Sequence, residues 1–164
     1  MQLAIYQIDA FTDTPFHGNP AAVCPLEAWL ADDVLQAIAM ENNLSETAFF
    51  VPEGEGYGLR WFTPALEVDL CGHATLATGY LILHRLSPGR DAVSFESRPG
   101  TLEVRRDGHA LAMNFPVLAP GAAVNPAPAL ASAMGAVPDD CRLIREMHGA
   151  PYILLVSESE AQGA

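Results

Sequence analysis

Apolar and polar residues alternate in short runs along the first 115 residues, and turn residues separate the runs. Alternation with a period of two, enriched in β-branched and aromatic residues, is typical of strands. Proline, glycine and Asp-Gly pairs mark the turns between them. The pattern predicts strands at residues 3–11, 21–24, 47–51, 59–63, 93–97, 100–106 and 110–115.

Two longer segments have a helical pattern. The first begins with Asp32-Asp33, whose carboxylates suit the first turn of a helix, and ends at Asn42-Asn43. The second runs from about residue 72 to residue 86 and carries apolar side chains on nearly every side. A helix without a polar face is buried, so we expect sheet to surround the second helix.

Beyond residue 116 the pattern is weaker. A connector rich in proline, alanine and glycine precedes a short helix at 129–134 and strands at 143–148 and 152–156. Residues 157–162 resemble the N-cap and acidic first turn of another helix, within which the chain stops. We therefore expect a domain core at residues 1–116 and a remainder at residues 117–164 that is cut off before a second domain.

Charge and cysteine content narrow the class of protein. The 164 residues carry a formal net charge of −12, and the eight basic residues are scattered, which disfavours binding to nucleic acid or to an anionic membrane. The three cysteines are widely spaced, which fits a reducing compartment better than a disulfide framework. The start lacks the features of a signal peptide, and no apolar run is long enough to span a bilayer. We expect a cytoplasmic protein.

The segment Asp69-Leu70-Cys71-Gly72-His73-Ala74-Thr75 is the strongest candidate for chemistry, together with Glu46 upstream. It places a thiol, a flexible glycine and an imidazole consecutively at the start of the second helix. Such a start carries unpaired N–H groups and the positive end of the helix dipole, which suit an anion. A glutamate in a cleft can exchange protons with carbon. These residues predict a site that binds a small anionic molecule and moves a proton on it.

Each of these residues also has an ordinary structural explanation. Glu46 can be a surface or capping group, His73 a packing residue, and Gly72 a tight turn or a positive-φ position. For Cys71 we favour a small buried hydrophobe over a thiol whose pKa the helix start lowers. The remaining histidines show no paired spacing, so no metal site is expected.

Five motifs in a fixed order closely resemble the first half of the phenazine-biosynthesis isomerase (PhzF-like) family. They are Tyr6-Gln7-Ile8-Asp9-Ala10-Phe11, Gly18-Asn19-Pro20-Ala21-Ala22-Val23, Asn42-Asn43-Leu44-Ser45-Glu46-Thr47-Ala48-Phe49, Arg60-Trp61-Phe62-Thr63-Pro64 and Val68-Asp69-Leu70-Cys71-Gly72-His73-Ala74-Thr75.

The resemblance implies an α/β (α+β) fold like that of diaminopimelate epimerase, in which a curved mixed or antiparallel sheet wraps around a central buried helix. It implies two such halves with the active site between them, and proton transfer with no metal and no organic cofactor. It assigns proton transfer to Glu46, with His73 as the second catalytic residue and a substrate holder. Gly72 and His73 would bind the substrate carboxylate through backbone N–H groups, and Ser45 is a further substrate-binding candidate.

The chain also departs from the family pattern. Family members are about twice as long, and their second half supplies an Asp-Pro-x-Thr-Gly-Ser-Ala-like motif that this sequence lacks. We expect a PhzF-like isomerase half that shifts a double bond in a small carboxylate-bearing metabolite. One alternative is an epimerase or racemase that uses Cys71. Another is a non-catalytic remnant that binds a ligand or only dimerises. A lone half would expose apolar surface, which favours a homodimer.

Overall fold

The computed structural model of the protein describes residues 2–116, 119, 121–125, 128–134, 140–147 and 150–156. The chain divides into two compact units, residues 1–115 and residues 116–164. Each unit has its own sheet, and the larger unit carries all the candidate site residues.

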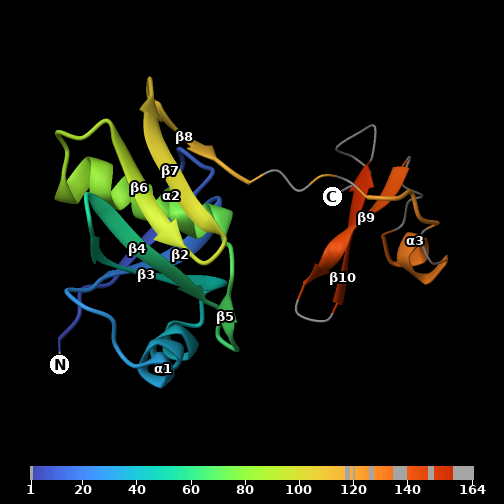
Figure 1. The fold of residues 1–164 in the computed structure, drawn as a ribbon, viewed down its shortest axis with the longest axis horizontal. Helices are drawn as coiled ribbons and strands as arrows, with labels where there is room; N and C mark the ends of the chain where they lie inside the picture. Colours follow the sequence, from blue (N-terminus) through green and yellow to red (C-terminus); the bar gives the residue numbers. More distant parts are fainter. Residues whose placement is uncertain are drawn as a thin grey trace. The chain divides into compact units, whose positions relative to one another are not determined.

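The first unit is an eight-stranded mixed sheet that curves around one helix (Figure 1). The strand order is β1-β2-β3-β4-β6-β7-β8, with β5 paired to β4 at the side. Neighbours are antiparallel except for the parallel pairs β2–β3 and β4–β6. The strands are β1 (Tyr6–Ala10), β2 (Asn19–Pro25), β3 (Glu46–Glu53), β4 (Gly56–Phe62), β5 (Glu67–Val68), β6 (Ala92–Ser97), β7 (Gly100–Asp107) and β8 (Ala110–Asn114).

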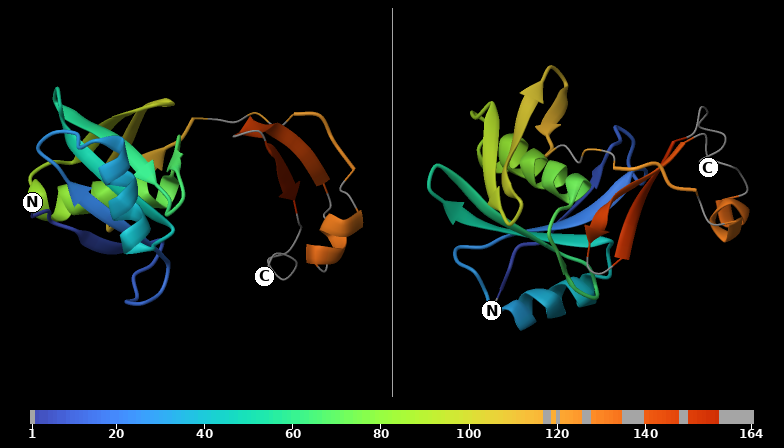
Figure 2. Two further views of the ribbon diagram at one scale, coloured as in Figure 1. Left: turned by 90° about the horizontal axis from the view of Figure 1, so that it is seen from below. Right: turned by 45° about the vertical axis from the view of Figure 1, so that its right-hand side comes forward.

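Helix α2 (Gly72–Leu81) lies inside the curve of the sheet, as the all-round apolar pattern predicts (Figure 2). It packs against strands from both ends of the sheet order, including β1, β2, β7 and β8. Small side chains make this close approach possible, and the buried positions include Ala74, Ala77 and Gly79. The α/β architecture with a central buried helix is therefore confirmed.

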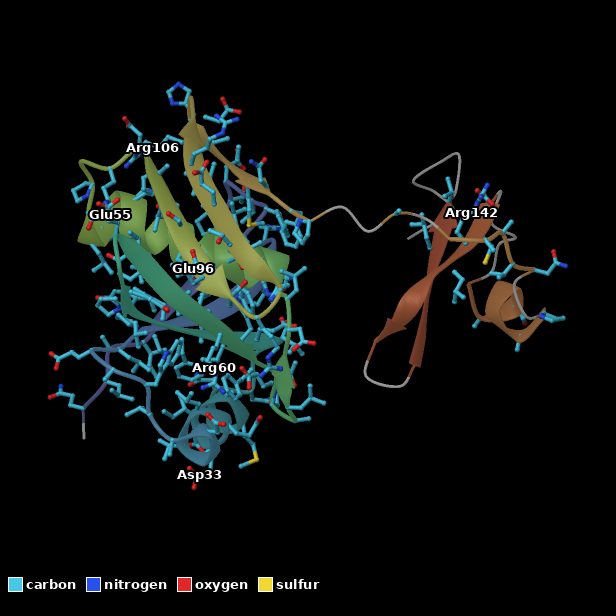
Figure 3. The ribbon with its side chains drawn as sticks, viewed as in Figure 1. Asp33, Glu55, Arg60, Glu96, Arg106 and Arg142 are labelled. Carbon is cyan, nitrogen blue, oxygen red and sulfur yellow. The ribbon has the colours of Figure 1, made fainter. Side chains whose placement is uncertain are left out.

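The last turn of this helix differs from the expectation of a regular helix to residue 86. Regular α-helix ends at Leu81, and Ile82–Leu86 form a π-helical turn in which the Ser87 N–H donates to the carbonyl of Ile82 at 2.7 Å. Arg106 of β7, labelled in Figure 3, binds this turn and the segment after it. Its guanidinium donates to backbone carbonyls at and beyond the helix end, namely those of Leu83, Pro88 and Arg90.

Helix α1 (Asp32–Asn42) covers the opposite face of the sheet and links the parallel strands β2 and β3. Its buried residues Leu35 and Ala39 pack against a separate apolar cluster that includes Phe49 and Val51 of β3. The helix ends as predicted, with Asn43 in the left-handed conformation at φ 50°. Strand β3 is thus held between α1 on one face and α2 on the other.

The second unit contains helix α3 (Pro128–Met134) and the antiparallel strands β9 (Asp140–Met147) and β10 (Ala150–Val156). The predicted helix and both predicted strands are present, although β9 begins three residues earlier than the sequence pattern indicated. His148 and the helix start expected at residues 157–162 lie outside the described residues. Within the described part of the chain, no helix has the length and apolar character needed to cross a bilayer.

The contact between α2 and β7 generates a stability prediction. A Cβ atom at Gly79 would lie 2.6 Å from Cγ1 of Val104 and 2.8 Å from its Cβ, so Gly79→Ala must push helix and strand apart. Overpacking of this kind costs about 1–3 kcal/mol, partly offset by the roughly 1 kcal/mol that alanine gains in helix propensity. We expect a net loss centred on about 1 kcal/mol, within roughly 0–2 kcal/mol, in the free energy of unfolding, measured by urea denaturation.

Gly89→Ala is the matched control, because a Cβ atom at Gly89 meets nothing within 4 Å. Its free energy of unfolding should stay within about 0.5 kcal/mol of the original chain. Equal stability of the two variants would contradict the close packing described for α2.

Candidate active site

Strand register points Glu46 toward the central helix. Alternate residues of a strand face opposite sides of a sheet. In β3, Ala48 and Phe50 belong to the apolar cluster around α2, whereas Phe49 and Val51 belong to the cluster under α1. Glu46 shares the parity of Ala48 and Phe50, so its side chain lies on the α2 side.

The imidazole of His73 meets this carboxylate. His73 is in the first turn of α2 and is only 8% exposed, and its Nε2 lies 3.2 Å from Oε2 of Glu46. Both atoms are buried, yet the angles are not those of a hydrogen bond, and neither atom has a hydrogen-bond partner among the described residues. Buried polar atoms without partners are rare and call for an explanation, of which a catalytic role is one.

Cys71 caps the start of α2 and contacts the other side of the imidazole. Its backbone is extended, and its Sγ lies 3.5 Å from Nδ1 of His73. The hydroxyl of Thr75 donates to the Cys71 carbonyl at 2.6 Å, which fixes the turn into the helix. The thiol, the imidazole and the Glu46 carboxylate therefore form a compact cluster, with one atom of each within 4.8 Å of the others.

The ionisation of Cys71 differs from what the helix start alone predicts. Burial raises the pKa of the thiol to about 12, and the Glu46 carboxylate raises it further, while the backbone N–H groups of Ala74 and His73 act in the opposite direction. The less favoured alternative, in which the helix start lowers the thiol pKa, is therefore not supported, because loss of hydration outweighs the helix dipole. The explanation of Cys71 as a small buried residue fits this environment.

The start of α2 retains the features of an anion site. The first backbone bond of the helix runs from the Thr75 N–H to the Cys71 carbonyl, so the N–H groups of Gly72, His73 and Ala74 precede it. The first turn contains no acidic side chain that would compete for these groups. An external carboxylate would therefore meet the backbone N–H groups of the first turn, of which those of His73 and Ala74 also act on the Cys71 sulfur, and the positive end of the dipole.

Packing around position 72, and not a positive φ, explains the glycine there. Among the described residues, the glycines with positive φ are Gly18, Gly54, Gly100 and Gly108, so of the explanations offered for Gly72 the positive φ does not hold and the tight turn into the helix remains. A Cβ atom at Gly72 would lie 3.0 Å from the ring of Phe115, which packs against the helix start. Phe115 is thus a neighbour of the site that the motif pattern did not indicate.

Two further candidates from the sequence, Ser45 and Asp69, lie near the site but do not contact the Glu46–His73 pair in the same way. Ser45 immediately precedes Glu46 and is exposed. Asp69 forms an ion pair with Arg98, whose Nη1 lies 2.6 Å from Oδ1 of Asp69. The structure thus brings Glu46, Cys71 and His73 into contact, while Asp69 faces away into a salt bridge.

A network of ion pairs that the motifs did not reveal holds the segment leading into α2. Arg60 of β4, labelled in Figure 3, binds Glu67 of β5 with two hydrogen bonds of 2.7 and 2.8 Å. It also contacts Asp32 of α1 at 2.9 Å. Arg98 adds a contact of 3.3 Å to Glu67. The Arg60 hydrogen bond lowers the pKa of Glu67, and its partner carboxylates raise the pKa of Arg60. In the sequence, only the strand alternation pointed to these ion pairs, because it places Arg60 on the face of β4 opposite to the buried Trp61.

Three potential metal ligands occur together at this site. Glu46, Cys71 and His73 each offer one atom, and these atoms lie within 4.8 Å of one another. Nδ1 of the imidazole faces the thiol, and Nε2 faces the carboxylate. An ion bound by both the thiol and the carboxylate could use only one of these two nitrogens, so the ring would have to turn. We do not assign the group as a metal centre.

Two hollows of the described first unit lie away from the Glu46–His73 pair. One of about 1050 Å³ runs along β1 and the exposed side of α2, and one of about 390 Å³ adjoins the ion pairs of Arg60. Neither is lined by Glu46 or His73.

Comparison with known proteins identifies the relatives of this chain. Residues 8–162 match the model of the PhzC-PhzF family, described as phenazine biosynthesis-like protein. An uncharacterized isomerase of Pseudomonas aeruginosa is 59% identical over 126 residues, covering 77% of this chain and 49% of that protein. A second from the same organism is 48% identical over 160 residues, covering 98% of this chain and 59% of that protein.

Solved structures agree with these relatives. A PhzF-family protein of Enterococcus faecalis superposes with a TM-score of 0.84 at 41% identity, over 99% of this chain and 60% of that chain. A predicted epimerase of Pseudomonas aeruginosa, at 24% identity and a TM-score of 0.73, shares the fold. The architecture is thus the diaminopimelate epimerase-like one. The chain spans about half to three fifths of the length of these relatives.

The environment of Cys71 generates a reactivity prediction. With the pKa raised from 9.0 to about 12, the thiolate fraction at pH 8 falls roughly thousandfold. We expect iodoacetamide to leave Cys71 unmodified in the folded chain and to alkylate it readily in urea, as measured by peptide mass spectrometry. Alkylation of folded and unfolded Cys71 at equal rates would show that the thiol is neither buried nor protonated as described.

Proposed function

Because the chain belongs to the phenazine biosynthesis-like (PhzC-PhzF) family, we propose that it is an isomerase half in which Glu46 carries a proton between two carbons of a small carboxylate-bearing metabolite. The observation that carries this proposal is the pair of buried atoms, Glu46 Oε2 and His73 Nε2, that lie 3.2 Å apart without a hydrogen-bond partner in the described structure. The names of the relatives, uncharacterized isomerases, support the class of reaction.

The proposed reaction needs only a carboxylate as proton carrier and donors that hold the substrate. The Glu46 carboxylate removes a proton from one carbon, the electron pair left behind moves through a conjugated double bond, and Glu46–H returns the proton to a second carbon. The substrate keeps its formula, and no redox partner or organic cofactor takes part. The N–H groups at the start of α2 hold the substrate carboxylate, and His73 holds the substrate near Glu46.

An anionic substrate is proposed in spite of the strongly acidic chain. The net charge of −12 repels anions at long range, so attraction must come from local donors. The start of α2 has the required donors and no acidic side chain in its first turn. We therefore favour one small carboxylate over a larger polyanion, and Ser45, exposed beside Glu46, is proposed as a further contact to it.

The alternative that uses Cys71 as a base is less well supported. Stereoinversion by two thiols needs one of them as a thiolate, and burial raises the pKa of Cys71 to about 12. A double-bond shift through one carboxylate requires no such ionisation. This difference favours the isomerase over the epimerase alternative.

The proton-carrier role predicts a large effect of Glu46→Gln. The change keeps the shape of the side chain but removes the group that accepts and returns the proton, so turnover should fall by roughly 10²–10⁴-fold. Turnover is measured by NMR as the change in position of the double bond in candidate unsaturated carboxylates, using this chain alone or supplied with the second half of a relative.

Glu41→Gln provides the control, because Glu41 is an exposed residue of α1. It alters the charge as Glu46→Gln does and should leave the rate unchanged. An undiminished rate for Glu46→Gln would refute the proton-carrier role. Turnover by the 164-residue chain alone would refute the alternative of a non-catalytic binding remnant.

We also propose that the chain assembles as a homodimer, since it spans about half to three fifths of its relatives' length and a second copy could supply the opposite wall. Large apolar side chains exposed in the first unit, such as Phe11, Phe16 and Tyr80, are consistent with further contacts. Light scattering should give about twice the 17.5 kDa mass of one chain, and a monomeric mass at micromolar concentration would refute the proposal.

A further inference from the structure

We propose that Cys71 is a positioning residue: its thiol donates a hydrogen bond to Nδ1 of His73 and thereby holds the imidazole in the tautomer that carries its proton on Nε2, facing Glu46. The functional consequence rests on the proposed proton-carrier role of Glu46, whereas the tautomer itself follows from the contacts alone.

The first step is the contact between thiol and ring. Sγ of Cys71 lies 3.5 Å from Nδ1 of His73, and the two residues are only 7% and 8% exposed. A neutral imidazole has one donor nitrogen and one acceptor nitrogen, and a thiol is a weak donor. Because water is largely excluded, the weak S–H donor has little competition for Nδ1.

The second step is the contact at the other ring nitrogen. Nε2 of His73 lies 3.2 Å from Oε2 of Glu46, which is an acceptor when ionised. The angles are not those of a hydrogen bond, so the two groups interact through charge: a proton on Nε2 is attracted to the carboxylate, whereas a lone pair on Nε2 would be repelled by it. The Nε2–H tautomer leaves the Nδ1 lone pair to the thiol, for which the nearby Glu46 carboxylate is the competing acceptor.

The third step is the state of the thiol. A thiolate at Cys71 would accept a proton from Nδ1 and reverse the arrangement. Burial raises the pKa of Cys71 to about 12, so the thiol remains a donor at neutral pH. The environment that disfavours Cys71 as a base therefore suits it as a donor.

The consequence concerns the fate of the transferred proton. With Nδ1 occupied by the thiol and Nε2 already protonated, His73 offers no free lone pair to Glu46–H. The proton that Glu46 takes from one carbon then stays on Glu46 until it returns to the second carbon. Cys71 would in this way protect the carboxylic acid from losing its proton to the neighbouring ring.

The test uses ¹⁵N-histidine NMR of the chain about two pH units above the ordinary histidine pKa, where imidazoles are neutral. His73→Gln identifies the ring signals of residue 73. We expect the original chain to show the Nε2–H tautomer at this residue. Protonation on Nδ1 would overturn the proposal.

The contribution of Cys71 is isolated in a Glu46→Gln background, because a glutamine amide can face Nε2 either as donor or as acceptor. Adding Cys71→Ala removes the thiol and should shift the tautomer ratio toward Nδ1–H by roughly two- to tenfold, the contribution of one modest hydrogen bond. Adding Cys71→Ser instead supplies a hydroxyl donor and should restore the Nε2–H tautomer. An unchanged ratio with Cys71→Ala would refute the positioning role.

Infrared spectroscopy of the S–H stretch tests the bond directly. The spectrum of the original chain minus that of Cys71→Ser isolates the Cys71 band, and the same difference in a His73→Leu background gives the band without its acceptor. We expect the first band at lower wavenumber, and coincident bands would contradict the hydrogen bond. Neither spectrum requires turnover, so these results and those of the Glu46→Gln rate test fail or succeed independently.

Discussion

The structure depends on the fit of helix α2 within the curve of one sheet. Strands from both ends of the sheet order contact this helix, so it has almost no side on which a bulky or charged residue is tolerated. Buried Ala74, Ala77 and Gly79 provide the room, and a methyl group at Gly79 would already collide with Val104. This packing fixes where the helix begins, and the helix start is where the candidate chemistry lies.

The same burial decides how the reactive groups behave. It removes water from the thiol of Cys71 and from the facing atoms of His73 and Glu46. Desolvation outweighs the helix dipole at Cys71, so the thiol stays protonated at neutral pH, and in the proposed mechanism the carboxylate transfers the proton. In the same proposal the helix start acts through its N–H groups, which bind the anionic substrate. One packing arrangement thus separates the roles of three neighbouring side chains.

The sequence predicted the elements whose pattern is local. Strand alternation, the acidic start of α1 and the all-round apolar character of α2 each have a short-range physical cause, and the structure agrees with them. The π-turn after Leu81 was not predicted, and its contacts include hydrogen bonds from Arg106 of a strand distant in sequence. The Arg60–Glu67 network, the raised pKa of Cys71 and the contact of Phe115 with Gly72 likewise arise from residues brought together only by folding. The catalytic and substrate-binding roles themselves stay predictions.

The register of β3 has a consequence for how such chains can diverge. Glu46 points to α2 only because it is separated by even steps from Ala48 and Phe50, which pack there. Residues between Asn43 and Glu46 are exposed or half-buried and can change in identity. Inserting or deleting one residue in this connection would shift the glutamate by one position along the strand. Because the apolar alternation keeps the rest of β3 in place, the carboxylate would then lie on the opposite face of the sheet. We therefore expect evolutionary drift here through substitution, with the length of this short connection conserved.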